Sequence, residues 1–268
     1  MWEGGAGGAV GAGGGAVYGR GRAPGRRPTT ASRQTYVTGN AARHASLEVR
    51  KLLSLTAAEM LDAPPQSLTF RNGTISHNGN SVLLADVVKA ARREGRVPKV
   101  SYQYVAPLVP LYHHFAFGFA AQAVLVEVNV KSGETKVLKI IAANDVGRVI
   151  NPLALQGQVE GSLSMGLGMA LQENFELKDG VVQTDTLYKC RLPTIDQTPE
   201  VISFFVEAET KDGPYGAKGV GELASIPTAP AIINAIHAAT GVRCYSLPAS
   251  KKWLKAQLEQ AGVAPLAT

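Results

Sequence analysis

The chain has 268 residues, of which 45% are hydrophobic and 18% are charged, the balance of a globular protein. It contains no run of about 18 apolar residues, so we expect no membrane span. Its two cysteines suffice neither for a disulfide framework nor for a four-cysteine metal site, which indicates a cytoplasmic, reducing setting. The net charge of +6 does not by itself indicate a nucleic-acid partner.

Residues 1–28 differ in composition from the rest of the chain. They are rich in glycine, alanine and arginine and contain few large apolar residues, so they are predicted to be disordered. Gly/Arg tracts can bind RNA, but these arginines are few and lack interleaved aromatic residues, so nucleic-acid binding is a remote alternative. Ordinary sequence begins abruptly at Thr29, and a truncated or out-of-frame gene model is therefore another explanation of the tract.

The first ordered part is expected to contain two helices separated by a hairpin. The predicted elements are a helix over residues 39–61, strands at 67–70 and 74–77, and a helix over residues 82–93. Thr38 is a suitable N-cap for the first helix, and Pro64 ends it. Asn72-Gly73 is a strong hairpin signal. A second Asn-Gly pair precedes Ser81, the predicted N-cap of the second helix, which Gly95 closes.

The remainder of the chain alternates β-prone and helical stretches. The predicted elements are strands at 115–130 and 136–143, a helix over 152–172, strands at 173–177, 180–183 and 201–207, and helices over 227–239 and 250–260. Asn151 is the expected N-cap of the helix that starts at Pro152. Four glycines in that helix indicate that something packs very close to it. Hairpins and separate helices favour an α+β fold.

The segment Gly213–Glu222 carries the strongest functional signal. It places four glycines around Lys218 and ends in one carboxylate. Glycine lets a backbone take unusual conformations and approach a ligand closely, so Glu222 is a candidate general base, and we expect a desolvated pocket around it. The segment is no P-loop, because Ala217 and Gly219 flank the lysine. The alternatives are a purely structural turn and, for Lys218, an ordinary solvated lysine.

Other motifs have structural explanations. Residues 166–171 mimic part of a dinucleotide fingerprint, but they lie inside a predicted helix, where close helix packing explains the glycines. His113 and His114 precede a predicted strand, and adjacent residues of a strand face opposite sides, which argues against a metal site. Three acids are interpreted as surface or turn residues: Asp145, Glu207 and Glu209.

Three segments, taken together in their order and spacing, resemble the C-terminal molybdopterin-binding region of the xanthine dehydrogenase/aldehyde oxidase family. They are residues 29–40, residues 144–168 with Asn-Asp-Val-Gly-Arg-Val-Ile-Asn-Pro at the start, and residues 213–236. The resemblance extends from Thr29 to about Leu254. It implies an α+β domain of hairpins, a mixed sheet and packed helices over residues 29–268, the C-terminal fragment of a larger subunit.

The resemblance also implies a chemistry. Members of this family hydroxylate a carbon of a purine, another N-heterocycle or an aldehyde, with water as the oxygen source. The dithiolene of a molybdopterin holds the molybdenum, so no protein side chain is expected as a metal ligand; in bacterial members the cofactor is often the cytosine dinucleotide form. The glutamate that corresponds to Glu222 is the base that deprotonates the Mo-bound hydroxyl.

Cofactor-binding residues follow from the same resemblance. The expected cofactor contacts are Thr29, Thr30, Ala31, Ser32, Arg33 and Gln34, together with Gln158, Gly219 and Gly221. The first six resemble the family loop that holds the pterin and its phosphate through backbone and hydroxyl groups, a role suited to exposed N–H donors. Gln158 resembles the glutamine that hydrogen-bonds the pterin.

Partners are implied as well. The family's N-terminal molybdenum-domain loops have no counterpart in this sequence, so the resemblance implies a partner polypeptide that carries them. Iron–sulfur clusters and FAD are expected on further domains or subunits, which makes the isolated chain inactive. The alternative is a truncated, non-catalytic remnant or assembly module that lacks half of the active site. The substrate is a small molecule whose identity depends on pocket residues outside this chain.

Overall fold

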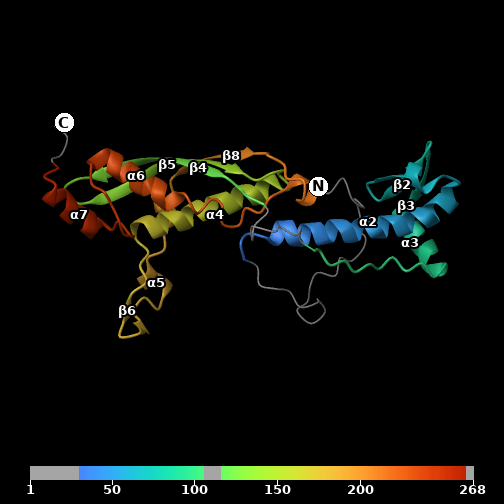
Figure 1. Ribbon diagram of the computed structural model, residues 1–268, viewed down its shortest axis with the longest axis horizontal. Coiled ribbons are helices and arrows are strands. Elements are labelled where there is room, and N and C mark those ends of the chain that lie inside the picture. Colours follow the sequence, from blue (N-terminus) through green and yellow to red (C-terminus); the bar gives the residue numbers. More distant parts are fainter. Residues whose placement is uncertain (1–29, 106–115, 264–268) are drawn as a thin grey trace. The chain divides into compact units, whose positions relative to one another are not determined.

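The computed structural model describes residues 30–105 and 116–263 (Figure 1). Thr29, His113 and His114, which entered the sequence predictions, lie outside these residues. The chain divides into two compact units with the boundary between Phe115 and Ala116, and each unit is described by itself. No helix in the described ranges is long and apolar enough to cross a membrane.

The first unit is a long helix against a small antiparallel sheet. Its elements are α2 (Gln34–Leu61), η1 (Pro65–Ser67), β1 (Thr69–Arg71), β2 (Thr74–His77), β3 (Asn80–Leu83) and α3 (Leu84–Arg93). The strands pair in the order β1-β2-β3. The C-terminal half of α2 packs on this sheet and on α3, burying an apolar cluster: Leu53, Ala57, Ala58, Leu68, Ile75, Leu84, Val87 and Ala91.

Two predictions for this unit were wrong in detail. Helix α2 begins at Gln34 and not at residue 39, because a tight turn precedes it and Thr38 already lies in the helix. Ser81 belongs to β3 and caps nothing, and α3 starts at Leu84. The second Asn-Gly pair, whose φ angles are both positive, forms another hairpin turn, so the turn signal outweighed the capping signal.

Residues 96–105 return beside α2, as the green extended segment in Figure 1 shows. Arg96 pairs with Glu59 at 2.7 Å, and the ring of Tyr102 stacks on that of His44 with centroids 4.8 Å apart. The first contact lies at the C-terminal end of α2 and the second in its N-terminal half, so the segment runs back along the helix.

The second unit is a mixed sheet with helices on one face. Strands β4 (Ala120–Asn129) and β5 (Glu134–Asp145) form an antiparallel hairpin, and β8 (Glu200–Val206) pairs with β5 in parallel. On the covered face lie α4 (Pro152–Leu171), α6 (Thr228–Thr240) and α7 (Lys251–Gln260). Helix α6 packs on β4, α4 on α6 and β8, and α7 on β5. The predicted α+β class with a mixed sheet is confirmed.

Local sequence signals determine the ends of these helices. Asn151 Oδ1 accepts a hydrogen bond from the Ala154 amide at 3.0 Å, and Ser250 caps α7 in the same way. Gly241 ends α6 with a φ of +74°. The predicted cap at Asn151 is confirmed, because a cap needs only residues within one turn of it.

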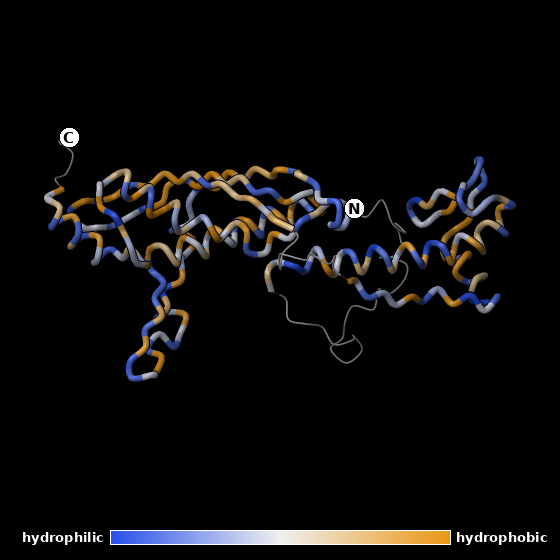
Figure 2. The backbone as a smooth tube through the Cα atoms, in the orientation of Figure 1, coloured by the Kyte–Doolittle hydropathy of each residue, from blue (hydrophilic) through white to orange (hydrophobic). Residues whose placement is uncertain are grey.

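A projecting segment, the arm, follows α4. It comprises residues 173–199 with β6 (Leu177–Lys178), β7 (Val181–Val182), the short helix α5 (Leu187–Cys190) and η2 (Ile195–Gln197). Its strands are shorter than the predicted ones. Figure 2 shows hydrophobic residues along it, and several are more than half exposed: Phe175, Leu177, Val181, Leu187, Tyr188 and Ile195.

Candidate active site

The glycine-rich segment does not hang free; it is bonded to the end of β5. The Lys218 amide donates to the Val146 carbonyl at 2.9 Å, and the Arg148 amide donates to the Gly216 carbonyl at 3.1 Å. Between these bonds Gly147 faces Ala217 in an isolated bridge. The short η3 helix (Pro214–Gly216) lies just before this contact. The loop therefore pairs with the residues that directly follow β5 and extends the sheet beyond the end of that strand.

A buried ion pair lies inside this contact. Lys218 Nζ is 2.6 Å from Asp145 Oδ2, and the side chains are only 12% and 9% exposed. The other carboxylate oxygen of Asp145 accepts a bond from the Gly147 amide at 3.2 Å. The interpretations of Lys218 as a solvated lysine and of Asp145 as a surface acid were therefore wrong. Glu207 is exposed, as predicted, although its carboxylate accepts a bond from the Val149 amide at 2.7 Å.

The second half of the loop is held from two other elements. Gln158 on α4 donates from Nε2 to the Gly221 carbonyl at 3.0 Å. Gln122 on β4 donates from Nε2 to the Ala224 carbonyl at 2.7 Å. Glu222 lies between these two anchored carbonyls, in the turn that leads to α6. The structure therefore brings together three predicted site residues: Gln158, Gly221 and Glu222.

Glu222 itself is exposed. The desolvated pocket expected around it is not formed by the described residues of this unit. The carboxylate is presented on a backbone that is anchored on both sides.

The predicted phosphate-binding loop forms the start of α2 in the first unit. Ala31 and Ser32 both have a φ of +52°, unusual for residues with side chains, and the Arg33 amide closes the turn onto the Thr30 carbonyl at 3.3 Å. The helix that follows has no side-chain N-cap and no acidic residue in its first turn. Amide donors at such a helix start suit a phosphate, so these residues fit the phosphate of a pterin cofactor.

The glycines of α4 fall into two groups. A side chain at Gly166 would collide with Thr228 of α6, which confirms close helix packing there. A Cβ at Gly157 or Gly161 would meet nothing within 4 Å. These two glycines flank the exposed Gln158 and leave the helix backbone accessible beside it. That surface fits a flat group lying close to the helix.

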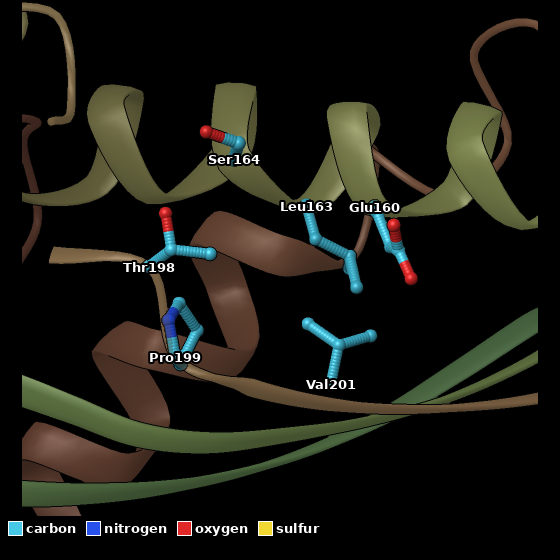
Figure 3. A pocket seen from close by; sticks show the side chains of 6 residues that line it. All are labelled: Glu160, Leu163, Ser164, Thr198, Pro199 and Val201. Carbon is cyan, nitrogen blue, oxygen red and sulfur yellow. The ribbon is translucent and has the colours of Figure 1, made fainter. Parts of the chain in front are cut away.

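One cavity of about 240 Å³ opens between α4 and the start of β8 (Figure 3). Its lining residues are Glu160, Leu163, Ser164, Thr198, Pro199 and Val201. None of them belongs to the predicted site, and Glu160 already accepts a bond from Gln156 Nε2 at 2.6 Å. Among the residues that the structure describes, no group of three or more His, Cys, Asp or Glu side chains could hold a metal ion.

Comparison with known proteins identifies the class. Residues 20–199 match the molybdopterin cofactor-binding domain, and the chain belongs to that family. It is 32% identical over 243 residues to the xanthine dehydrogenase molybdenum-binding subunit of Escherichia coli O157:H7, covering 87% of this chain and 31% of that protein. It is 33% identical over 224 residues to the gamma subunit of the 6-hydroxypseudooxynicotine dehydrogenase complex of Paenarthrobacter nicotinovorans, covering 81% of this chain and 28% of that protein.

A solved structure has the same fold. Quinoline 2-oxidoreductase from Pseudomonas putida 86 superposes with a TM-score of 0.74 at 23% sequence identity, covering 87% of this chain and 31% of that one. The chain thus spans about a third of the length of the relatives that it matches.

Sequence reasoning missed Gln122 and the Asp145–Lys218 pair. Both act across more than seventy residues of chain, since the ion pair joins positions 73 apart and Gln122 reaches a carbonyl 102 residues away. One sequence signal was available for Asp145. A charged residue at the end of a β-prone run can be buried, and a buried charge needs a partner of opposite charge.

Proposed function

We propose that this chain is the C-terminal part of the molybdenum subunit of a hydroxylase, an oxidoreductase that adds a water-derived oxygen to a carbon of a purine, another N-heterocycle or an aldehyde. The observation that carries the proposal is the position of Glu222, held between the anchored carbonyls of Gly221 and Ala224. Membership of the molybdopterin-binding family and relatives that are molybdenum subunits support it.

Different residues of this chain would contact different parts of the cofactor. The turn and helix start at Thr30–Gln34, with the preceding Thr29, would bind the cofactor phosphate through backbone N–H groups. Gln158 and the loop glycines Gly219 and Gly221 would lie beside the pterin. When bound, the molybdenum–molybdopterin group, for which we propose the cytosine dinucleotide form, supplies the two-electron oxidation of the substrate carbon.

Glu222 would act as the general base. Its carboxylate would accept the proton released as the water-derived oxygen attacks the substrate, which requires a carboxylate whose backbone stays in place while its oxygens reach the reacting atoms. Anchors on α4 and β4 meet that requirement. Enclosure of the exposed carboxylate would come from a partner polypeptide carrying the rest of the subunit, with iron–sulfur and FAD-bearing partners taking the electrons.

The test is Glu222→Gln in the reconstituted complex of this chain with its partner polypeptides. The amide keeps the shape and removes the base, so kcat is expected to fall by about 10²–10⁴-fold while the molybdenum content stays unchanged. Glu160→Gln, which alters another exposed carboxylate of the same unit, serves as the control and should turn over normally. Near wild-type turnover in Glu222→Gln would reject the assigned base.

A second candidate is a non-catalytic assembly module. The exposure of Glu222 and the coverage of a third of the relatives favour it. The two candidates differ when partner polypeptides are supplied: the enzyme acquires stoichiometric molybdenum and turnover, whereas the module forms the complex and gains neither.

A further inference from the structure

The Asp145–Lys218 pair lies close in sequence to the proposed base. Only three residues separate Lys218 from Glu222, so the lysine and the base can be at most about 14 Å apart along the chain. Downstream, Gln158 fixes the Gly221 carbonyl. The position of Glu222 therefore depends on two anchors, one at each end of this short segment.

The lysine anchor is built into the fold. Its amide bonds to Val146, its ammonium pairs with Asp145, and its stem lies so close to Gly147 that a Cβ there would be 3.0 Å from Lys218 Cγ. A Cβ at position 147 would overlap the Gly216 carbonyl, so a glycine is required there for the backbone contact that brings the lysine to the carboxylate. Three separate contacts thus hold one residue of the loop.

An ion pair is a costly means of adding stability. Removing two charges from water costs several kcal/mol, and well-packed apolar residues in place of a buried pair are often equally stable or more so. A buried pair does, however, favour one geometry over its neighbours, because its attraction depends on charge separation. Its presence beside a proposed base is therefore better explained by placement than by stability.

We propose that Asp145 and Lys218 are positioning residues that set the location of Glu222, an inference that rests on the proposed function for its catalytic consequence but not for its effect on the loop. Neither side chain touches the substrate in this scheme. They hold the Gly216–Glu222 backbone against the end of β5, so that the carboxylate is presented in one place.

The first experiment follows the loop without using activity. Amide hydrogen exchange is measured on the full chain for peptides covering residues 216–224. In Lys218→Met the buried carboxylate loses its partner, and exchange is expected to become at least about tenfold faster. Lys251→Met, which breaks the exposed Lys251–Glu134 pair at 2.8 Å, is the matched control and should leave these peptides unchanged. Unchanged exchange in Lys218→Met would overturn the proposal.

The second experiment separates placement from stability in the reconstituted complex. Lys218→Met is expected to lower kcat on the order of 100-fold with little change in KM, and Lys218→Arg to recover much of it. The double variant Asp145→Leu/Lys218→Met leaves no unpaired buried charge and should unfold like the wild type, yet remain slow. If the double variant regains both stability and turnover, the pair is only structural and the proposal fails.

A failure of the positioning role can be distinguished from a failure of the proposed function. If Glu222→Gln turns over normally, the base assignment is lost, while the exchange data still decide whether the pair positions the loop. If Lys218→Met does not fold, Lys218→Arg and the double variant carry the comparison. Turnover in the double variant equal to the wild type, with Glu222→Gln inactive, rejects the positioning role alone.

Discussion

Gly147 is the residue at which two segments of the second unit come too close for any side chain. Its φ is +60°, and a Cβ there would overlap the Gly216 carbonyl and press on the stem of Lys218. The same residue donates its amide to Asp145. One glycine thus permits the backbone contact, the lysine's approach and the carboxylate's orientation.

Gly147→Ala is therefore expected to destabilise the chain by about 1–3 kcal/mol, because it adds both a strained φ and a collision. Gly161→Ala is the control. It adds the same methyl group in the middle of α4, where nothing lies within 4 Å, and should instead stabilise the chain by about 0.5–1 kcal/mol. Urea unfolding measures both. Equal effects of the two substitutions would contradict this account of Gly147.

At this scale the sequence was informative wherever a residue acts on its neighbours. Asn151 was assigned correctly as the N-cap of α4, because it accepts a bond from the Ala154 amide within the first turn of that helix. Lys218 and Asp145 were misread because a side chain's burial depends on the segment that folds against it, and that segment is 73 residues away.

At the scale of elements, α4 shows how one helix serves two purposes. Gly166 admits Thr228 of α6, which belongs to the core, whereas Gly157 and Gly161 leave open the surface around Gln158. The glycine density of this helix predicted a close neighbour. It did not reveal which of the glycines face the protein's own side chains, because a helical repeat does not say which face of the helix is covered.

The end of α4 also allows a prediction about pH. Burial raises the pKa of the Glu173 carboxyl, which folds back over Gly168 at the helix end. Its stabilising contribution is complete below the unfolded pKa and is lost as pH rises through the higher folded pKa. Glu173→Gln should therefore melt at a higher temperature than the wild type at pH 7 and at the same temperature near about pH 3.5.

The control for that experiment has the opposite sign. Lys251 hydrogen-bonds Glu134 and lowers the pKa of its carboxyl, so this contribution is present above the unfolded pKa and is lost as pH falls through the lower folded pKa. Glu134→Gln should thus melt slightly below the wild type at pH 7. Calorimetry at both pH values distinguishes the two cases, and a higher melting temperature for both variants at pH 7 would contradict the interpretation.

At the scale of the whole molecule, the arm is the part of the second unit whose apolar residues are least buried by packing on the core. Tyr188 and Ile195 are each 92% exposed on a segment held mainly by its own short strands. Exposed apolar side chains of this kind are typical of a contact with another polypeptide. We therefore assign the arm to the contact with the partner polypeptide put forward in the proposed function.

Protease protection tests this assignment. Trypsin should cut the isolated chain early at Lys178 and Arg191 on the arm, and cutting should slow on the order of 100-fold when the partner polypeptide is present at about 100 times its Kd. Tyr188→Ser with Ile195→Ser should reduce that protection. Tyr245→Ser, equally exposed but outside the arm, is the matched control. An arm that is cut at the same rate with and without the partner would refute the assignment.

The order of strands in the mixed sheet also has a consequence for how the second unit folds. The β4–β5 hairpin closes across a four-residue turn, whereas the parallel β5–β8 pair must wait until α4 and the arm have been looped out between them. Residues 213–224 can dock only onto the finished end of that sheet. The hairpin is therefore expected to form early and the segment bearing Glu222 among the last. A chain arrested late in folding would then possess nearly all of its core and still lack the placement of the proposed base.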